Sequence, residues 1–220
     1  MSLRARIDRF NRRHPWSHND FYGPWVAGQV GAARRVLDIG CGTGNLIDRL
    51  RNGNRQITGL EPDPRVAELA AARFAGDPAV VIEQTRFDPA RTTGAWDAIT
   101  MVASLHHLPL PETLRAVDRC LAPGGRLVVV GCFRESGPAD GAIGLIALVA
   151  NLARGLRAHP RGVDRPPVAM TAPVAAPRET LAEIRAAAAE SLPGARLRRR
   201  LFWRYALVYD KPVSGRRPPE

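Results

Sequence analysis

Between residues 34 and 133, short apolar runs alternate with segments in which apolar residues recur at helical spacing. The short runs predict strands, and the segments between them predict helices. Such alternation is typical of βαβ units, in which parallel strands form a sheet that helices cover on both faces. The predicted strands are 35–39, 57–60, 80–83, 98–102 and 127–130, and the predicted helices are 45–50, 64–74 and 111–121.

The first 33 residues have a different pattern, which combines basic residues with most of the aromatic residues of the first half of the chain. A basic helical pattern ends near Pro15, and a second predicted helix runs to Val30. Ser17 and Asn19 both belong to residue types that cap helix N-termini, so either one can begin this second helix.

The chain after residue 133 changes in character again. Residues 141–153 form an apolar run, which at thirteen residues is shorter than the roughly 20 that a membrane-spanning helix needs. We therefore expect a buried or cap helix there and no membrane span. Five prolines predict an irregular loop over 159–177, followed by a helix at 178–189 and an antiparallel pair of strands within 195–212.

Composition narrows the class of protein. Hydrophobic residues make up 45% and charged residues 24% of the chain, which excludes a wholly disordered or fibrous protein. The three cysteines cannot all pair and form no CxxC motif, so we expect a reducing compartment, the cytoplasm. The arginine-rich N-terminus has no apolar run behind it, unlike a signal peptide or a membrane anchor.

The net charge of +11 admits two interpretations. It can mark a surface for a polyanion such as nucleic acid. However, 31 of the 32 basic residues are arginines, and they are spread along the whole chain with clusters near both ends. We favour solvated arginines and expect no nucleic-acid partner.

The most informative segment is VLDIGCGTGNL at residues 36–46. A strand leads into a turn with Gly40, Gly42 and Gly44, and a helix follows, so the backbone can pass close to a ligand. The third glycine comes one position too early for the GxGxxG spacing of dinucleotide sites. Asp38 places a negative charge near the turn, which suits a cationic ligand better than a diphosphate.

This segment resembles motif I of the class I S-adenosylmethionine (SAM) dependent methyltransferases. WDAITMVASLHHL at 96–108 and LAPGGRLVVV at 121–130 resemble the fourth and fifth strands of that family, and ALVYDKP at 206–212 resembles the closing hairpin of its ubiquinone/menaquinone-biosynthesis members. The resemblance implies a Rossmann-like, doubly wound α/β fold. Its seven-stranded sheet would be mostly parallel, with a C-terminal antiparallel hairpin and helices on both faces.

The resemblance also implies SAM as the cofactor, with S-adenosylhomocysteine as the product, and it assigns most of the binding residues. Glu61, followed by Pro62, stands where the family has the acid that binds both ribose hydroxyls. A carboxylate accepts two such hydrogen bonds well. The residues that would lie against the amino-acid part of SAM are Asp38, Gly40, Cys41, Gly42 and Gly44.

One position departs from the family pattern. Arg86 stands where an acidic residue commonly binds the adenine amino group, and arginine cannot accept that hydrogen bond. Either Asp88 takes this role in a shifted register, or Phe87 and the backbone hold the base. Val102, at the end of the predicted fourth strand, completes the predicted cofactor-binding residues.

Two adjacent histidines follow the fourth strand, at the edge that faces the methyl group in this family. Imidazole titrates near neutral pH, so either His106 or His107 can take a proton from an acceptor. We expect only one of them to point inward and favour His107; the alternative is that both merely orient the loop. No Asp or third His stands at ligand spacing, so we expect no metal.

The N-terminal segment and the last strands offer candidates for the acceptor site. In small class I enzymes an N-terminal helix closes over the cofactor, and here it would place four residues in a lid. The alternative is a capped helix that packs its aromatic residues on the sheet. Trp203, Arg204 and Tyr205 have the same ambiguity, and we take them as strand residues first. The four lid candidates are Trp16, His18, Asn19 and Tyr22.

Together these features predict an enzyme that moves a methyl group from SAM to an O, N or C nucleophile of a small molecule by in-line displacement. The insertion after the fifth strand would form a substrate cap, since such loops carry specificity. The chain then divides into an N-terminal helical lid at 1–33, a SAM-binding core at 34–133, the cap at 134–177, a C-terminal helix and hairpin that complete the core at 178–212, and a tail at 213–220.

Two alternative functions remain open at this point. The arginine clusters suit an RNA or protein methyltransferase, although the chain has no NPPY-like motif and no RNA-binding module. The departure at Arg86 suits a SAM-binding protein without catalysis. The sequence also leaves the oligomeric state open between a monomer and a homodimer.

Overall fold

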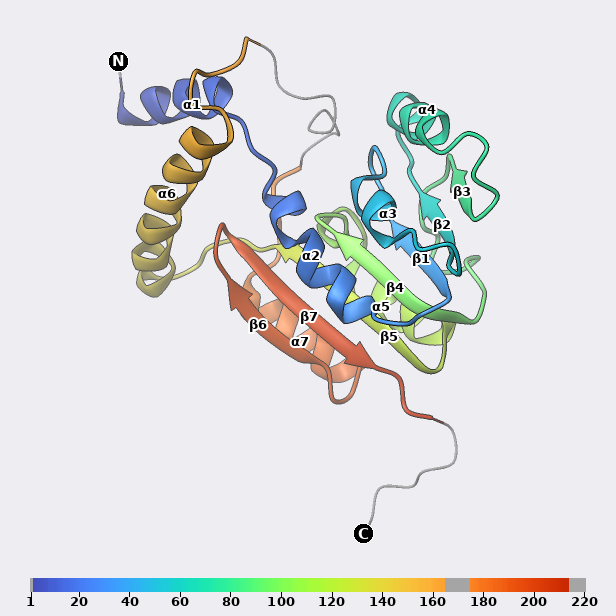
Figure 1. The fold of residues 1–220 in the computed structure, drawn as a ribbon. Helices are drawn as coiled ribbons and strands as arrows, with labels where there is room; N and C mark the ends of the chain where they lie inside the picture. The colour runs from blue at the N-terminus through green and yellow to red at the C-terminus, as the bar shows by residue number, and fades with distance from the viewer. Residues whose placement is uncertain (1, 165–174, 214–220) are drawn as a thin grey trace.

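The computed structural model describes residues 2–164 and 175–213. A seven-stranded sheet with the strand order β3-β2-β1-β4-β5-β7-β6 forms its centre (Figure 1). The strands are β1 (Arg35–Ile39), β2 (Gln56–Leu60), β3 (Val80–Glu83), β4 (Trp96–Val102), β5 (Leu121–Cys132), β6 (Arg196–Arg200) and β7 (Arg204–Asp210). The helices are α1 (Leu3–Arg13), α2 (His18–Val30), α3 (Asn45–Leu50), α4 (Pro64–Arg73), α5 (Leu110–Cys120), α6 (Pro138–Ala158) and α7 (Leu181–Ser191), with a short 3₁₀ helix, η1 (Leu105–His107).

The sheet is parallel from β1 to β5 and antiparallel at its last two strands. β7 runs antiparallel to β5, and β6 antiparallel to β7. The carboxyl ends of the parallel strands therefore share one edge, and the strand order reverses between β1 and β4, where open α/β sheets bind ligands. This topology confirms the predicted doubly wound α/β fold with its C-terminal antiparallel hairpin.

Two hydrophobic cores lie on opposite faces of the sheet, because successive side chains of a strand point to opposite sides. Leu37, Ile99 and Leu127 belong to the core beneath α5 and α7. Val36 and Val128 pack on the other face with residues of α2 and α3. Helices thus cover both faces of the sheet (Figure 1).

The structure decides one helix start that the sequence left open, and it shifts the bounds of α6 and α7. Ser17 is the cap of α2, since its side-chain oxygen accepts a hydrogen bond from a first-turn backbone N–H, and Asn19 already lies inside the helix. α6 runs for 21 residues and extends beyond the predicted 141–153 on both sides. α7 begins later than predicted because Thr180 and Glu183 form a capping box there.

Helices α1 and α6 lie to one side of the sheet, where α1 crosses one end of α6 (Figure 1). A Cβ at Gly155 would come within 2.7 Å of the carbonyl oxygen of His14, so the two segments are in close contact. Residues 165–174 of the predicted proline-rich loop and 214–220 of the predicted tail lie outside the described residues. Within the described ranges, no helix combines the length and the apolar character that crossing a membrane requires.

Candidate active site

A cavity of about 650 Å³ opens at the carboxyl edge of the parallel strands, beside the switch point between β1 and β4. This volume is typical of sites for small molecules and cofactors. The loops after β1, β2, β3 and β4 line it, together with the start of α2 and one residue of β7. All but three of the predicted site residues line this cavity. Those that line it are Trp16, His18, Asn19, Asp38, Gly40, Cys41, Gly42, Glu61, Pro62, Phe87, Val102, His106 and His107.

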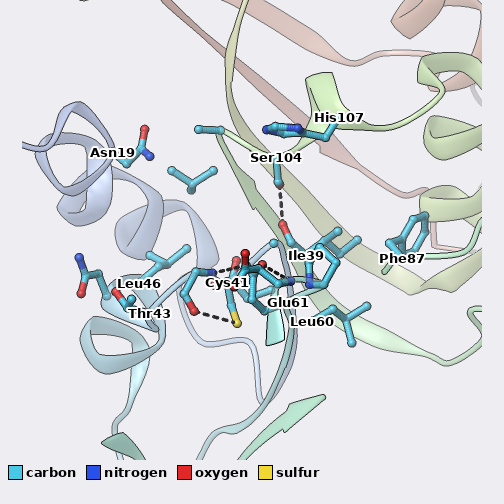
Figure 2. Close-up of a pocket in the computed structure, with 18 of the residues that line it drawn as sticks. Asn19, Ile39, Cys41, Thr43, Leu46, Leu60, Glu61, Phe87, Ser104 and His107 are labelled. Carbon is cyan, nitrogen blue, oxygen red and sulfur yellow. Dashed lines mark hydrogen bonds between the residues drawn. The ribbon is translucent and has the colours of Figure 1, made fainter. Parts of the chain in front are cut away.

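The glycine loop turns sharply at Gly40, where β1 ends against the loop after β4. Gly40 has a φ of +74°, and a Cβ there would come within 2.5 Å of the Cβ of Ser104. The Ser104 hydroxyl donates a hydrogen bond to the carbonyl of Ile39 (Figure 2). On the other side, the backbone N–H of Gly40 donates to the carbonyl of Leu60 at 2.8 Å. Glycine is therefore the residue that fits at position 40.

Glu61 directly follows β2 and is only 6% exposed. Its Oε2 accepts a hydrogen bond from the backbone N–H of Gly42 at 3.0 Å, and its Oε1 accepts one from the backbone N–H of Asp63 at 3.0 Å (Figure 2). Each oxygen keeps a further acceptor position. Gly42 has open space where a Cβ would stand. A ligand with two neighbouring hydroxyls can therefore bind Glu61 while it passes over Gly42.

Asp38 lies on β1 and is almost completely buried, at 2% exposure. The hydroxyl of Thr100 on β4 donates to its Oδ1 at 2.7 Å. Burial raises the pKa of Asp38 to about 7; the Thr100 hydrogen bond opposes this rise, and the nearby Glu61 adds to it. A cationic group in the cavity would reverse the shift, because an opposite charge favours the ionised carboxylate.

Cys41 lies between these two acids and is also buried, at 7% exposure. Burial raises the pKa of its thiol, and Asp38 and Glu61 raise it further. A Cβ on Gly59 of β2 would come within 2.8 Å of the Cys41 sulfur, so the side chain is packed closely against the sheet. The thiol is therefore protonated and has no nucleophilic character.

The structure does not bring Gly44 or Tyr22 to the cavity lining. Gly44 has a φ of +80°, and a Cβ there would lie 2.3 Å from the ring of Phe74, so this glycine serves the packing of the loop against Phe74. Tyr22 is buried, and its hydroxyl donates to the carbonyl of Leu201 at 2.9 Å. For Tyr22 the alternative of an aromatic residue packed inside the protein is the correct one.

Asp88 is the third predicted residue that does not line the cavity. Its Oδ1 accepts a hydrogen bond from the backbone N–H of Ala90 at 2.8 Å, and it pairs with Arg91 at 3.7 Å. It lines a second cavity of about 680 Å³ instead, which shares Phe87 with the first. Phe87 is 3% exposed and lines both. Phe87 therefore lies at the first cavity, whereas Asp88 does not.

Both histidines line the cavity, where the sequence predicts that only one does. They belong to η1, which follows a sharp turn at Ala103 with a φ of +56°. Successive residues of a 3₁₀ helix are about 120° apart, not opposite as in a strand, so neighbouring side chains can face the same space. Their ring centroids are 4.2 Å apart.

The two imidazoles differ in basicity. The pKa of His106 is lowered to about 4, mainly by burial and also by the nearby His107 and Arg204. Burial and then Arg86 also lower the pKa of His107, while Glu61 opposes this. Both rings are therefore neutral at pH 7, with His106 the weaker base. In the part of the chain that the structure describes, no three His, Cys, Asp or Glu side chains gather as a metal site.

Asn151 of α6 joins the N-terminal segment to the insertion after β5, and sequence reasoning missed it. It is 5% exposed. Its Oδ1 accepts a hydrogen bond from the indole N–H of Trp16 at 3.0 Å and lies 2.8 Å from Nε2 of His18. Its Nδ2 donates to Asn11 at 3.0 Å. A single asparagine inside an apolar run was the available signal.

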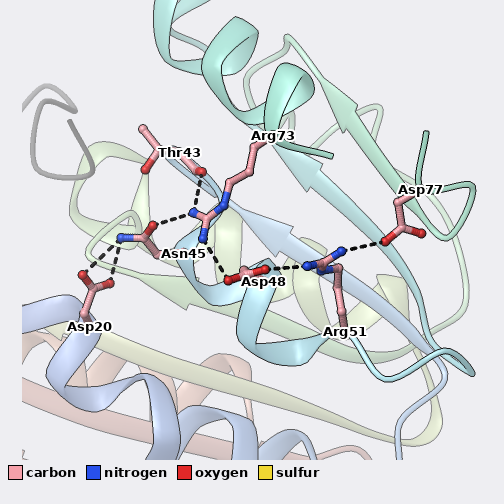
Figure 3. A network of polar contacts seen from close by, with 7 residues as sticks. All are labelled: Asp20, Thr43, Asn45, Asp48, Arg51, Arg73 and Asp77. Atoms are coloured by element: carbon pink, nitrogen blue, oxygen red, sulfur yellow. Dashed lines mark hydrogen bonds and ion pairs between the residues drawn. The ribbon is translucent and has the colours of Figure 1, made fainter. Parts of the chain in front are cut away.

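A polar network at the rim of the cavity supports the glycine loop (Figure 3). Arg73 of α4 donates to the carbonyl of Thr43 at 3.3 Å, to the Asn45 side chain at 2.8 Å and to Asp48 at 2.9 Å. Asn45 in turn donates to both carboxylate oxygens of Asp20 on α2, at 3.0 and 3.1 Å. The loop is thus tied to α4 on one side and to α2 on the other.

Comparisons with known proteins agree with this site. Residues 37–127 match the family model described as a methyltransferase domain. An uncharacterized methyltransferase of Mycobacterium bovis is 30% identical over 205 residues, which cover 90% of this chain and 98% of that protein. The chain belongs to the class I SAM-dependent methyltransferases. The family predicted from the ordered motifs is thereby confirmed.

Two further similarities are to named methyltransferases. A ubiquinone biosynthesis O-methyltransferase of Xanthomonas oryzae pv. oryzae is 33% identical over 100 residues, 44% of this chain and 42% of that protein. The structure of human N-acetylserotonin methyltransferase in complex with SAM has a TM-score of 0.57 at 15% identity, and the match covers 90% of this chain and 52% of that one. The second similarity shows a shared fold.

Proposed function

We propose that this methyltransferase binds SAM in the cavity and transfers the methyl group to a small-molecule acceptor. One observation carries the proposal: two buried carboxylates, Asp38 and Glu61, stand at neighbouring strands with the open backbone of Gly42 beside them. One carboxylate suits an ammonium group, and the other suits a pair of ribose hydroxyls. The SAM complex of the human structural neighbour supports this choice of cofactor.

Each group of SAM has a counterpart in the cavity. Asp38 would accept a hydrogen bond from the ammonium group through the oxygen that Thr100 leaves free. Glu61 would accept from both ribose hydroxyls through its remaining lone pairs while it keeps its two backbone hydrogen bonds. Phe87 would offer an apolar contact to the adenine ring.

The protein's contribution to the reaction is mainly alignment. Bound SAM supplies an electrophilic methyl group, and in-line displacement needs the acceptor atom held in position in a dry site. A hydroxyl or ammonium acceptor must also lose a proton. We propose that Nδ1 or Nε2 of His107 accepts this proton, because the pKa of His106 is too low for an effective base. His106 then serves to position the loop.

The cavity favours a small acceptor over RNA or protein. Trp16, His18 and Asn19 of the N-terminal segment line it together with the sheet edge, so the acceptor site lies beneath the predicted lid. The relative from Xanthomonas is named for ubiquinone biosynthesis, which is small-molecule chemistry. The domain division into lid, core, cap and C-terminal hairpin fits this arrangement and remains part of the proposal.

Calorimetric titration with SAM tests the proposal. We expect Glu61→Ala to weaken SAM binding by about 100-fold, since it removes two charge-assisted hydrogen bonds and leaves two backbone donors unpaired. Glu68→Ala, on the exposed side of α4, is the matched control and should bind SAM like the wild type. Equal affinity of all three proteins would overturn the assignment. SAM binding with no methyl transfer to any of a broad panel of metabolites would favour the non-catalytic alternative.

A further inference from the structure

The cavity extends well beyond the cofactor residues along the sheet edge. Arg204 lines it from β7, where it pairs with Cys132 of β5. β7 is the third strand away from β1, which carries Asp38. With neighbouring strands about 4.8 Å apart, the two strands are separated by about 14 Å. Arg204 therefore belongs to the part of the cavity where the methyl acceptor would lie.

Arg204 has no ion pair with any carboxylate among the described residues. Its guanidinium makes two long hydrogen bonds, to the carbonyl of Phe202 at 3.4 Å and to the side-chain oxygen of Asn19 at 3.3 Å. Its Nε is buried and has no hydrogen-bond partner within residues 2–164 and 175–213. A partly buried cation that finds only neutral, distant acceptors is a good site for an anionic oxygen group.

The groups around Arg204 do not compensate its charge. His18, His106 and Cys132 line the same part of the cavity, and Arg204 lowers the pKa of both histidines in addition to burial. All three groups are neutral at pH 7. Asp20 also lines the cavity, but among the described residues it forms no ion pair with Arg204, and its carboxylate oxygens accept hydrogen bonds from Asn45.

The wall beside Arg204 is aromatic. The ring of His18 stacks on Phe202 with centroids 5.6 Å apart, and the indole of Trp16 meets His18 edge to face at 4.4 Å. Asn151 holds both Trp16 and His18 in this position. A flat apolar body would find a rigid surface here, next to a positive charge.

We propose that Arg204 holds an oxyanion group, a carboxylate or a phosphate, on a methyl acceptor with a flat apolar body. This inference rests on the proposed function and specifies its substrate class. The oxyanion is an anchor: it pairs with the guanidinium of Arg204, while the nucleophilic atom of the acceptor is directed along the sheet edge toward the cofactor residues. Arg204 is thus a specificity-determining residue of the acceptor site.

Binding of three matched probes tests this without knowledge of the natural acceptor. Benzoate, phenyl phosphate and the neutral benzamide are titrated into protein saturated with S-adenosylhomocysteine. We expect at least one of the two anions to bind about tenfold more tightly than benzamide, because an ionic hydrogen bond replaces a neutral one. The tighter of the two anions identifies the kind of oxyanion.

Arg204→Gln should bring the anions to within about twofold of benzamide, and Arg204→Lys should keep part of the preference. Arg198→Gln, an exposed residue of the same hairpin, is the matched control and should keep all of it. Thermal unfolding confirms that each variant is folded. Equal binding of anions and benzamide, no measurable anion binding up to about 20 mM, or a preference that survives Arg204→Gln would each overturn the inference.

The affinity for S-adenosylhomocysteine separates this inference from the proposed function. We expect Arg204→Gln to leave that affinity within about twofold of the wild-type value. A large loss would show that Arg204 serves the cofactor's own carboxylate and not the acceptor, which overturns the inference alone. Failure of the wild-type protein to bind S-adenosylhomocysteine would overturn the proposed function and the inference together.

Discussion

The cavity has two halves that are assembled in different ways. In the cofactor half, the residues that carry the proposal lie within one stretch of the chain, 38–63. In the acceptor half, the contacts come from distant segments, and Trp16 and its partner Asn151 are 135 positions apart. The first arrangement leaves a compact motif in the sequence. The second leaves no local pattern, because each segment contributes one or two side chains.

The two halves are also held by different forces. Backbone hydrogen bonds and glycine contacts within the sheet edge hold the cofactor half, as at Gly40 and Glu61. Side-chain hydrogen bonds between helices that lie outside the sheet hold the acceptor half, as at Asn151. Substitutions in the two halves should therefore have separable effects, and the following predictions test that separation.

Asp38→Asn should give the largest effect, because it removes the buried charge opposite the proposed ammonium group. We expect the affinity for SAM at pH 8 to fall by more than about 100-fold, since a hydrogen bond between charged groups contributes up to about 3 kcal/mol. Thr100 can still donate to the amide oxygen of the new side chain. Calorimetry measures the loss, and an affinity within about fivefold of wild type would contradict the assignment of Asp38.

The same variant should be more stable than the wild type in the absence of ligand. The folded-state pKa of Asp38 is about 7, well above its ordinary value. Folding is therefore favoured by protonation of this group, and the cost of burying its charge is absent below about pH 4, grows up to about pH 7 and is constant above. The gain in Tm of Asp38→Asn should be largest at pH 8 and shrink toward pH 4. A gain independent of pH would mean that Asp38 is not the cause.

Gly44→Ala should have the opposite effect to Asp38→Asn: it should lower the stability and leave the SAM affinity nearly unchanged. Its Cβ would clash with Phe74, and its φ is left-handed, so we expect a loss of about 2–3 kcal/mol of unfolding free energy. SAM affinity should change by less than about threefold, because Gly44 does not line the cavity. Gly42→Ala is the matched control. Its φ of +56° is also left-handed but its Cβ meets open space, so the substitution should cost only about 1 kcal/mol of unfolding free energy. It should weaken SAM binding more than Gly44→Ala does, because Gly42 lines the cavity. Denaturant titration measures the stability of both variants, and calorimetry measures their SAM affinity. A larger loss of stability in Gly42→Ala, or a larger loss of SAM affinity in Gly44→Ala, would contradict the prediction.

The sequence predicted the sheet closely, and most of the residues that it proposed for the cofactor line one cavity, for a physical reason. Strand periodicity, the turn glycines, Asp38 on β1 and Glu61 directly after β2 form a pattern within residues 35–63. The hydrogen bonds that hold the two acids come from farther away, from Thr100 to Asp38 and from Gly42 to Glu61. Gly44 and Asp88 do not line the cavity, because these positions serve packing or a neighbouring loop. Family spacing alone does not separate a glycine that approaches a ligand from one that approaches Phe74.

The acceptor half was predicted less well, because its geometry depends on the tertiary arrangement. Two aromatic lid candidates sat in one short segment, but only Trp16 lines the cavity, while Tyr22 faces the hairpin. Because His106 and His107 are adjacent, the sequence predicted that only one of them points inward, whereas the 3₁₀ turn lets both face the cavity. Asn151 carried no motif, and its role follows from the contact between α6 and the N-terminal segment.

Asn151→Leu should have the smallest effect on the cofactor half and a clear effect on the acceptor half. The leucine has nearly the same size, but its side chain forms no hydrogen bond with Trp16, His18 or Asn11, so α1 should detach from α6 more often. The backbone carbonyl of residue 151, which also accepts from the Trp16 indole at 3.1 Å, is unchanged. We expect trypsin to cleave at the exposed Arg12 and Arg13 about tenfold faster, because local opening is easier by roughly one hydrogen bond's net contribution.

SAM affinity of Asn151→Leu should stay within about twofold of wild type, because the sheet edge is untouched. Leu145→Ser is the control, since Leu145 lies on the outer side of the same helix with 64% exposure, and its cleavage rate should match wild type. If Asn151→Leu left cleavage unchanged, the hydrogen bonds of Asn151 would not be what holds the N-terminal segment. If Asn151→Leu lowered SAM affinity as much as Glu61→Ala does, the two halves of the cavity would be energetically coupled. The inference that they can be altered independently would then be wrong.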